Sequence, residues 1–432
     1  MPDTIDDLPD PTEDASIAGR GSGTMIALIT GRSSRAVLAN TIRNVGQLPT
    51  FVLSRLSRRD PKLWVFGNLH GFRDSPRFMA EHVVHEQSEL TAWWIAHSAE
   101  EVEVVRAAGV EAALMGTPEA KSIQRRAGVA FFTHGFRDLD LPLLNGAHLV
   151  YLWHGVPFKR VGLDLNVAQA RRRPFAVRVA ARVVRWLTFR AYRMVDLYVA
   201  SGELDRERFL TAFGASPARV KALGSPRFDV IRGGEPYRRV MSTDLRVHLG
   251  YGSDDRIVLW VPTHRREYGD AAWLPQLTAE QLDAALAGSD VRLVVKTHPR
   301  AEWDVYRARL PDHPRLVLLR ETDVDVNCLL HIADALVTDY SSVVFDYAIL
   351  GRPVYFFAPD VDRYTADRGL YDPYDSLTGG LHHIDWPSLL EALAAGGDEG
   401  MDAWRRVADY VRNNDEPETC RRISEAIVSR KR

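Results

Sequence analysis

Residues 334–351 read DALVTDYSSVVFDYAILG, and this stretch indicates the fold class. The apolar run Ala335–Thr338 leads into Asp339–Ser342, and a mostly apolar stretch then reaches Leu350. Four apolar residues bounded by turn residues are typical of a buried strand, whereas the longer stretch predicts a helix over Ser342–Leu350. A strand that turns through serines into a helix is the repeating unit of α/β proteins.

The same alternation of strands and helices extends in both directions along the chain. Expected helices are Ser75–Glu89, Ala99–Ala108, Thr278–Ala287, Trp303–Arg309 and Val326–Ala333. The pattern predicts doubly wound parallel sheets in two halves, with domains at 25–220 and 221–432 and closing helices over Trp386–Arg432. The other expected strands are Met25–Thr30, Leu63–Phe66, Ala92–Ala96, Val129–Thr133, Leu149–Trp153, Arg256–Val261, Val291–Lys296, Arg315–Leu319 and Pro353–Phe357.

The composition is that of an ordinary globular chain. Among 432 residues, 46% are hydrophobic and 26% charged, which excludes a disordered, collagenous or coiled-coil protein. The formal net charge of −2 gives no global sign of a nucleic-acid binder. Cys328 and Cys420 are the two cysteines, too few for a disulfide framework or a four-cysteine zinc site, so the sequence predicts a reducing, cytoplasmic compartment.

The first 24 residues are acidic and then rich in glycine and serine. They lack the basic start and the apolar stretch of a secretory signal, so we expect a disordered acidic tail. The sequence also lacks an uninterrupted apolar run of about 18 residues, so no transmembrane helix is expected.

Residues 159–193 carry ten basic side chains and a single acidic one, Asp164. The spacing of Arg178, Arg182 and Arg185 places them on one helical face, beside an apolar stripe that includes Trp186. Such a basic amphipathic helix can lie on an anionic membrane surface. The alternative is a solvated helix face between domains, and no nucleic-acid-binding motif accompanies the patch.

The serine turn after Ala335–Thr338 is the first candidate ligand site. Ser341 and Ser342 place two hydroxyl groups and free backbone N–H groups at the start of a helix, an arrangement that suits a phosphate. The alternative is that one of the serines simply caps the helix.

A second candidate lies in YLWHGVPFKRVGLD, residues 151–164. His154 follows an expected strand, and ligands bind at the carboxyl ends of strands in open α/β sheets. Its imidazole suits it to accept a proton from a substrate hydroxyl. Gly155 would let a ligand approach the backbone, and Lys159 could meet an anion. The alternative is a packed histidine at a turn, because His134–Gly135 follows another expected strand in the same way.

Two further strands end in residues that suit an anion. Residues 293–300 read LVVKTHPR, with Lys296 and His298 at the strand end, and residues 258–266 read VLWVPTHRR, with Arg265 in the same place. Each could be a polar strand end that faces water, but three such strands in one half favour a phosphate site. Phosphate-loop, HExxH, CxxC and Gly-x-Ser-x-Gly motifs are absent from the sequence.

Several of these stretches together resemble the CDP-glycerol glycerophosphotransferases of teichoic-acid synthesis, the TagB/TagF-like proteins. The resemblance covers roughly residues 62–380. Val156 stands where the family usually has threonine, and Lys296 stands where it usually has arginine. Lysine cannot form the two parallel hydrogen bonds that an arginine guanidinium offers. The motifs that carry it are Leu63–Gly71, Trp153–Lys159 with Gly162 and Asp164, Gly224–Asp229, Val261–Arg265, Lys296–Pro299, Asp325–Asn327, Asp334, Thr338–Ser342, Phe345–Asp346, Gly351–Pro353, Phe356–Phe357 and Asp367–Gly369.

The resemblance implies a GT-B fold, in which two Rossmann-like domains face each other across a cleft. It implies that an acceptor hydroxyl attacks the β-phosphate of CDP-glycerol or a related CDP-alditol and that CMP leaves. Catalysis is expected from His154 as general base and from His298. The residues expected to hold the donor phosphates or to line the acceptor cleft are Arg265, Lys296, Asp339, Ser341, Ser342, Arg368, Gly155 and Lys159.

The resemblance also implies partners. The acceptor is expected to be a polyprenyl-linked glycan or polymer at the inner face of the cell membrane, where Arg178, Arg182 and Arg185 would meet anionic lipid. We expect no protein-bound metal, although a Mg²⁺ ion bound with the donor is compatible with the chemistry. The alternatives are a GT-B glycosyltransferase that uses a nucleotide sugar and a catalytically idle scaffold that binds lipid or glycan.

Overall fold

The computed structural model of the protein describes residues 48–164, 190, 192–234, 245–265, 273–297, 303–320, 324–367 and 369–429. Strands within these residues form two sheets, and every strand pairing is parallel. The strands are β1 (Asp60–Phe66), β2 (Thr91–Ala96), β3 (Glu111–Leu114), β4 (Ala127–Phe132), β5 (His148–Tyr151), β6 (Leu197–Ala200), β7 (Val220–Ala222), β8 (Arg256–Val261), β9 (Val291–Lys296), β10 (Leu316–Leu319), β11 (Ala335–Thr338) and β12 (Val354–Phe356).

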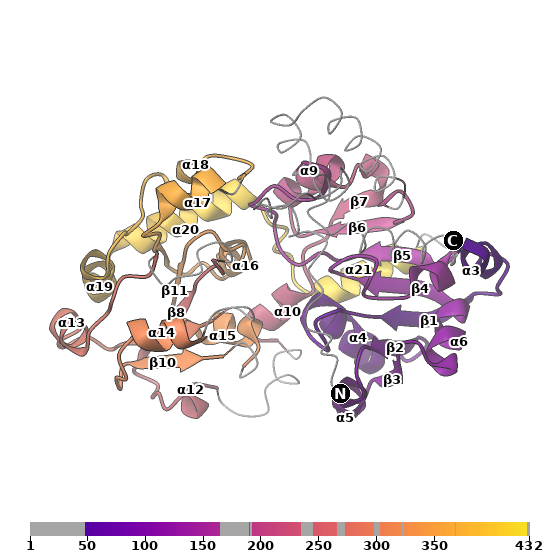
Figure 1. Ribbon diagram of the computed structural model, residues 1–432, viewed down its shortest axis with the longest axis horizontal. Coiled ribbons are helices and arrows are strands. Elements are labelled where there is room, and N and C mark those ends of the chain that lie inside the picture. Colours follow the sequence, from indigo (N-terminus) through magenta and orange to yellow (C-terminus); the bar gives the residue numbers. More distant parts are fainter. Residues whose placement is uncertain are drawn as a thin grey trace, which may run out of the picture.

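Helices connect the strands and cover the sheets (Figure 1). Among the described residues, short 3₁₀ helices span Leu141–Leu144, Pro217–Arg219 and Ala348–Leu350. The α-helices are α3 (Leu48–Ser54), α4 (Asp74–Glu86), α5 (Ala99–Ala107), α6 (Pro118–Arg126), α9 (Glu203–Ala212), α10 (Arg227–Ile231), α12 (Leu245–His248), α13 (Ala279–Ala285), α14 (Trp303–Arg309), α15 (Val326–Ile332), α16 (Val343–Tyr347), α17 (Val361–Asp367), α18 (Tyr374–Thr378), α19 (Trp386–Ala395), α20 (Asp398–Val411) and α21 (Thr419–Val428).

Both sheets have the strand order of a dinucleotide-binding fold. The first runs β3-β2-β1-β4-β5-β6-β7, and the second runs β10-β9-β8-β11-β12. In each, the direction of winding reverses at one point, between β1 and β4 and between β8 and β11. Ligands bind in the crevice beyond the carboxyl ends of the strands at such a point. The two Rossmann-like sheets confirm the α/β, GT-B fold expected from the sequence.

The central strands are apolar because both of their faces are covered. All six residues of β4 and all four of β11 are buried. Strands buried on both faces read as continuous apolar runs, which is why the sequence marks them clearly. The expected strands at β8, β9 and β11 have the predicted bounds. The edge strands β3 and β7 and their short inner neighbour β6, each three or four residues long, were not predicted.

The strand end expected at Trp153 is wrong by two residues. The sequence predicts a strand to Trp153, but β5 ends at Tyr151. Trp153 instead takes a positive φ of 55°, a conformation that a strand does not contain. The chain therefore turns out of the sheet just before His154.

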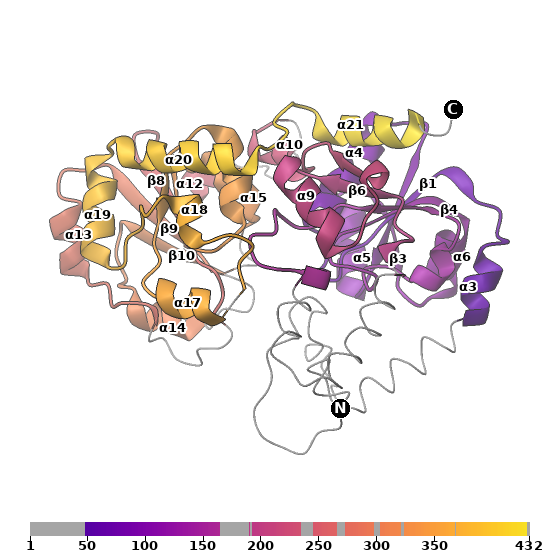
Figure 2. The ribbon, with the colours of Figure 1, turned by 90° about the horizontal axis from the view of Figure 1, so that it is seen from above.

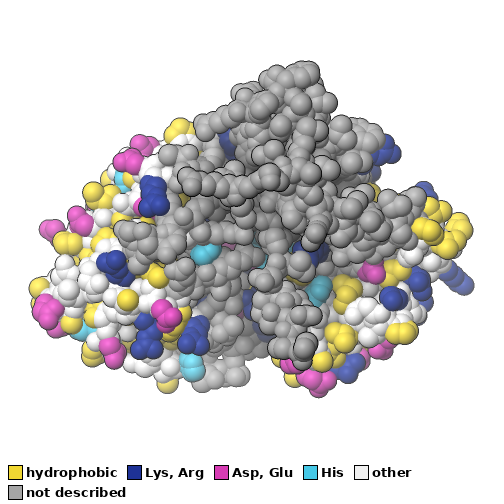
Figure 3. Space-filling view, in the orientation of Figure 1, with side chains coloured by type: hydrophobic (Ala, Val, Ile, Leu, Met, Phe, Trp, Pro, Cys, Tyr) yellow, Lys and Arg dark blue, Asp and Glu magenta, His cyan; other side chains and the backbone are white. Residues whose placement is uncertain are grey.

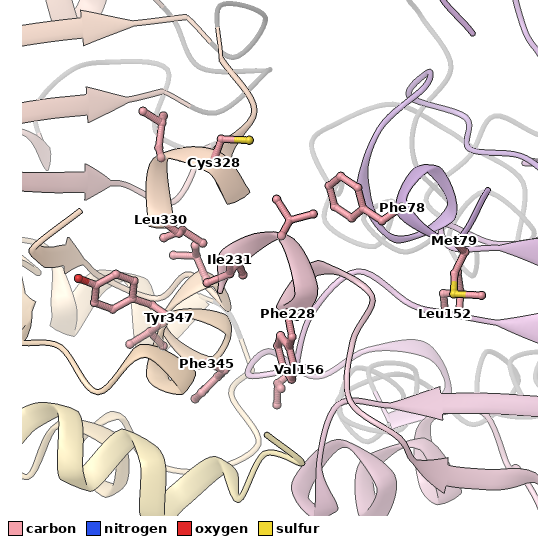
Figure 4. Packing of buried hydrophobic residues seen from close by; sticks show 14 of the residues in the cluster. Phe78, Met79, Leu152, Val156, Phe228, Ile231, Cys328, Leu330, Phe345 and Tyr347 are labelled. Atoms are coloured by element: carbon pink, nitrogen blue, oxygen red, sulfur yellow. The ribbon is translucent and has the colours of Figure 1, made fainter. Parts of the chain in front are cut away.

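The two sheets share a continuous apolar core at α10, as the close-up in Figure 4 shows. Phe228 on α10 lies beside Val156, which follows the first sheet, whereas Ile231 lies beside Leu330 of α15. Phe158 also contacts Phe345 of α16, with ring centroids 6.0 Å apart. These contacts fix the carboxyl edge of the first sheet against that of the second.

The last helices cross from one sheet to the other. Figure 2 shows α20 along the second sheet and α21 along the first, and α21 contacts α4 and α10. The sequence instead assigns all of 221–432 to the second domain, so that division stays a prediction. The expected tail 1–24, the strand Met25–Thr30 and most of the basic segment 159–193 lie outside the described residues.

Across the described part of the chain, no helix combines the length and the apolar character needed to cross a lipid bilayer. Figure 3 shows acidic and basic side chains intermixed over the outer parts of one face, beside scattered hydrophobic ones.

Candidate functional site

The first part of the site is the turn that follows β5. The Thr133 hydroxyl, just after β4, donates to the Trp153 carbonyl oxygen at 2.6 Å. The Trp153 side chain is 3% exposed. A positive φ at a bulky residue is costly and persists only where its surroundings hold it. Burial and the Thr133 bond hold this one, and they project the half-buried His154 from the sheet edge.

The environment of His154 sets its tautomer. Its Nδ1 lies 3.4 Å from the Thr133 carbonyl oxygen, which can only accept a hydrogen bond. In the neutral imidazole, this contact favours the proton on Nδ1 and the lone pair on Nε2. A histidine held in this way is suited to take a proton from a hydroxyl group placed at Nε2.

Gly155 brings the second sheet to this turn. A Cβ atom at Gly155 would stand 2.7 Å from the Ser342 Oγ, and the residue has a φ of 135°. Both the close approach and the backbone conformation require glycine. The His154 turn and the serine turn before α16 therefore meet directly.

The serine turn begins with a buried carboxylate. Asp339 is 1% exposed and accepts hydrogen bonds from the Thr263 N–H at 3.0 Å and the Thr263 hydroxyl at 2.6 Å. The Tyr340 N–H donates to the same Asp339 oxygen at 2.6 Å. These bonds join the ends of β8 and β11 at the point where the second sheet reverses. Asp339 thus orients the turn.

The two serines make few contacts within their own helix. The Ser342 side chain forms no cap hydrogen bond with α16, and the Ser341 Oγ accepts only a long one from the Val343 N–H, at 3.4 Å. Simple helix capping therefore does not account for both hydroxyl groups.

Arg265 is buried between two carboxylates. Its Nη1 lies 2.7 Å from Asp339 Oδ2, and its Nε lies 2.8 Å from Asp360 Oδ2. Burial lowers the pKa of the guanidinium, but the two carboxylates more than offset this and raise it. The side chain is 2% exposed and lies over the Trp273 ring at 4.3 Å. Arg265 therefore supports the Asp339 turn, and its contact with a donor phosphate stays a prediction.

Lys296 is buried as well. It is 3% exposed, and its Nζ donates to the Arg320 carbonyl oxygen at 2.6 Å. This bond ties the ammonium group to the residue that follows β10, and a contact with a phosphate stays a prediction. Lys159 is half-buried, with its Nζ 5.5 Å from the Tyr364 ring centroid on α17, so it links the loop after His154 to the second sheet.

Sequence reasoning missed one bridge of charged residues. Arg227 on α10 donates to Asp74 at 3.1 Å and to Asp346 at 3.0 Å, and its side chain is 6% exposed. Burial lowers the pKa of Arg227, but the two carboxylates raise it overall. Asp74 begins α4 beside the first sheet, and Asp346 lies on α16. The motif GSPRFD, residues 224–229, was the available signal.

The other expected site residues lie outside the described residues: His298, Arg368, Arg178, Arg182 and Arg185. Within the part of the chain that is described, no three His, Cys, Asp or Glu side chains are grouped to hold a metal ion.

The Asp339 turn gives a stability prediction. Replacing Thr263 with valine removes the 2.6 Å hydroxyl bond to a buried carboxylate at nearly constant shape. We expect the free energy of unfolding to fall by about 1.5–3 kcal/mol, because the bond is made to a charged group. Thr365→Val is the matched control, since the Thr365 hydroxyl bonds only backbone carbonyl oxygens of α17. Equal losses in thermal unfolding of the two variants would contradict the role of Asp339.

Comparisons with known proteins agree with the resemblance in the sequence. Residues 50–429 match the family described as CDP-Glycerol:Poly(glycerophosphate) glycerophosphotransferase. The chain is 28% identical over 249 residues to the teichoic acid ribitol-phosphate polymerase TarL of Staphylococcus aureus, a match that covers 57% of this chain and 41% of TarL. It is 30% identical over 204 residues to the teichoic acid ribitol-phosphate primase of Bacillus spizizenii, covering 46% of this chain and 50% of the primase. The matched region thus spans half or less of these two curated relatives.

Solved structures share the fold. The wall teichoic acid polymerase TagF superposes with a TM-score of 0.70 at 21% identity, covering 92% of this chain and 98% of that chain. A putative UDP-N-acetylglucosamine 2-epimerase from Listeria monocytogenes superposes with a TM-score of 0.51 at 17% identity, covering 86% of this chain and 97% of that one. At these identities the likeness concerns the fold alone.

Proposed function

Because the chain belongs to the CDP-glycerol:poly(glycerophosphate) glycerophosphotransferase family, we propose that it transfers glycerol phosphate, or a related alditol phosphate, from a CDP-alditol to a hydroxyl group of a lipid-linked wall-polymer precursor and releases CMP. The observation that carries this proposal is the contact between Gly155 and Ser342. It brings a histidine suited to proton transfer beside a serine turn suited to a phosphate.

In this proposal His154 is the general base. Its Nδ1–H donates to Thr133, so Nε2 can take the proton of the acceptor hydroxyl. The acceptor oxygen then forms a bond to the β-phosphorus of the donor. The bond from that phosphorus to the bridging oxygen breaks, and CMP leaves with the electron pair. General-base assistance of this kind contributes about 10²–10⁴ in rate.

The donor phosphates bind at the serine turn. Ser341 and Ser342 offer hydroxyl groups, and Asp339 fixes the turn through Thr263 and Tyr340. Arg265 acts as a positioning residue that holds Asp339 in place. His298 stabilises charge on the phosphate, and Arg368 meets the donor tail.

The family match favours this function over a GT-B glycosyltransferase that uses a nucleotide sugar. The likeness to a putative UDP-N-acetylglucosamine 2-epimerase concerns the shared fold, which does not choose between reactions. The released product separates the two functions, because a typical sugar transfer yields a nucleoside diphosphate and the phosphotransfer yields CMP. An idle scaffold would release neither.

The experiment that tests the proposal incubates purified protein with CDP-glycerol or CDP-ribitol and a membrane-lipid acceptor extract, and resolves the nucleotide products. We expect CMP that forms only when the acceptor is present. A nucleoside diphosphate released from a nucleotide sugar would support the glycosyltransferase instead. Absence of turnover with every donor would support the scaffold.

The acceptor places the protein at the inner face of the cell membrane, and the basic segment provides a contact with anionic lipid. Reversing the charge of Arg178, Arg182 and Arg185 to glutamate should weaken partitioning to anionic vesicles by at least about 100-fold, since the loss of three basic side chains alone removes about 1 kcal/mol each. Vesicle flotation measures this. The control reverses Arg405, Arg412 and Arg421, whose side chains are at least half exposed elsewhere. Equal flotation of the two triple variants would remove the segment as the anchor.

A further inference from the structure

Three histidines stack at the carboxyl edge of the first sheet. His70 follows β1, His134 follows β4 and His154 follows β5. The His134 and His154 rings are nearly parallel, with centroids 4.7 Å apart and planes inclined by 11°. His70 meets His134 edge-on, with centroids 4.5 Å apart and planes inclined by 88°. Because β1, β4 and β5 are neighbours in the sheet, their loops bring the three rings together.

A buried carboxylate builds this arrangement. Asp138 is fully buried, and its Oδ2 accepts the backbone N–H groups of Thr133 and His134, each at 2.7 Å. Its Oδ1 accepts the Leu69 N–H at 3.0 Å, so the same side chain also holds the loop that carries His70. Asp138 therefore fixes the backbone of the two loops that carry His70 and His134.

The stack has a consequence for protonation. Two imidazolium cations at this separation repel each other, so the pair takes up its second proton at a lower pH than its first. A proton on His134 therefore opposes a proton on His154. An uncharged ring at position 134 does not oppose a proton on His154, but it still fixes the orientation of the His154 imidazole.

Other ionisable groups face the stack. His70 touches His134 at its edge, and His97 approaches the Asp138 carbonyl oxygen at 3.2 Å. Arg227 lies on the side of Gly155, with Nη2 3.8 Å from where a Cβ of that glycine would be. In contrast to these groups, the His134 ring lies parallel to the His154 ring and stacks on one face of it.

We propose that His134 is a positioning residue of the transfer reaction: it holds His154 against the Thr133 carbonyl, and its own protonation keeps His154 available as a base in weakly acidic solution. The proposal rests on the proposed function of His154. The coupling between the His134 and His154 protons can be tested without the donor or the acceptor.

The first test is the pH dependence of CMP release by His134→Phe, which keeps an aromatic ring on His154 but cannot take a proton. We expect turnover within about twofold of wild type near pH 8. In the wild type, a charged His134 that lowers the pKa of His154 by about one unit keeps part of the His154 population unprotonated. His134→Phe lacks this repulsion, so its activity at about pH 5.5 should fall about fourfold further than that of the wild type. The matched control is His85→Phe, an exposed histidine in the last turn of α4, which should keep the wild-type profile.

The second test does not need catalysis. Histidine labelled with ¹³C at Cε1 is titrated by NMR, and the His154 signal is assigned by its loss in His154→Ala. In wild type we expect the His154 titration to extend over a wider pH range than a single proton gives. In His134→Phe it should become a single-proton curve with its midpoint at higher pH.

The outcomes separate this proposal from the proposed function. Identical His154 titrations in wild type and His134→Phe overturn the role of His134, whether or not CMP is released. Altered titration without any CMP release supports the coupling of the two rings and contradicts the proposed reaction. His134→Ala adds a readout of orientation: a fall in turnover at pH 8 that His134→Phe does not share supports positioning, and equal turnover contradicts it.

Discussion

Replacing His154 with alanine lowers the turnover number by about 10²–10⁴ and leaves the fold intact, because the variant loses the group that takes the proton of the acceptor. The KM for CDP-glycerol should change little, since the donor phosphates bind at the serine turn of the second sheet. A loss in kcat and kcat/KM together, at constant KM, identifies an interaction made in the transition state. Initial rates of CMP release at varied donor concentration measure both quantities.

The control for this variant is a measurement of its thermal stability. His154 is half-buried, and its Nδ1 donates a long hydrogen bond to the Thr133 carbonyl oxygen, so its replacement should shift the thermal midpoint by only a few degrees. His85→Ala, an exposed histidine on α4, should retain full turnover. Unchanged turnover in His154→Ala would exclude the histidine as the base. A large loss of stability with restored activity at low temperature would assign it a structural role instead.

The sequence predicted most of the strands that are buried on both faces. β8, β9 and β11 appear with the expected bounds because each is dominated by apolar, mostly aliphatic residues and is flanked by turn residues. β3 reads EAAL and β7 reads VKA, and neither contains enough apolar or β-branched residues to be recognised. These strands exist because neighbouring strands offer them a pairing edge, which is a tertiary effect.

The candidate site was predicted in part. The His154 turn and the Ser341–Ser342 turn were expected to share a site, and the structure brings them together through Gly155. The directions of Arg265 and Lys296 were not predictable, since their partners are distant in sequence: Asp360 is 95 residues from Arg265. A basic residue at the end of a strand gives the same sequence pattern whether its side chain faces a ligand or a buried carboxylate.

Replacing Arg227 should destabilise the fold strongly. It connects Asp74 beside the first sheet with Asp346 beside the second. Methionine at this position keeps much of the side-chain volume but leaves both carboxylates without their cation. Breaking a buried ion pair on one side costs about 3–5 kcal/mol, because a charge stays buried without compensation. Turnover should fall as well, since the same contact holds α16 and its serine turn against Gly155.

The loss in Arg227→Met should depend on pH. Burial already raises the pKa of Asp346, and the charge of Arg227 opposes that rise. Without Arg227 the pKa of Asp346 goes higher still. A carboxyl group whose pKa is higher in the folded state than in the unfolded state stabilises the fold at low pH, and this contribution disappears as the pH rises through the folded-state pKa. The stability deficit of the variant should therefore be smaller at pH 5 than at pH 8.

A double variant distinguishes this explanation from lost packing. Asp346→Asn removes the buried charge, so Arg227→Met with Asp346→Asn should recover part of the stability that Arg227→Met loses, and the remaining deficit should vary less with pH. Thermal unfolding of the wild type, both single variants and the double variant at the two pH values completes the comparison. If the double variant is as unstable as the sum of the single variants at both pH values, the contribution of Arg227 comes from its packing on α10 and not from the ion bridge between the sheets.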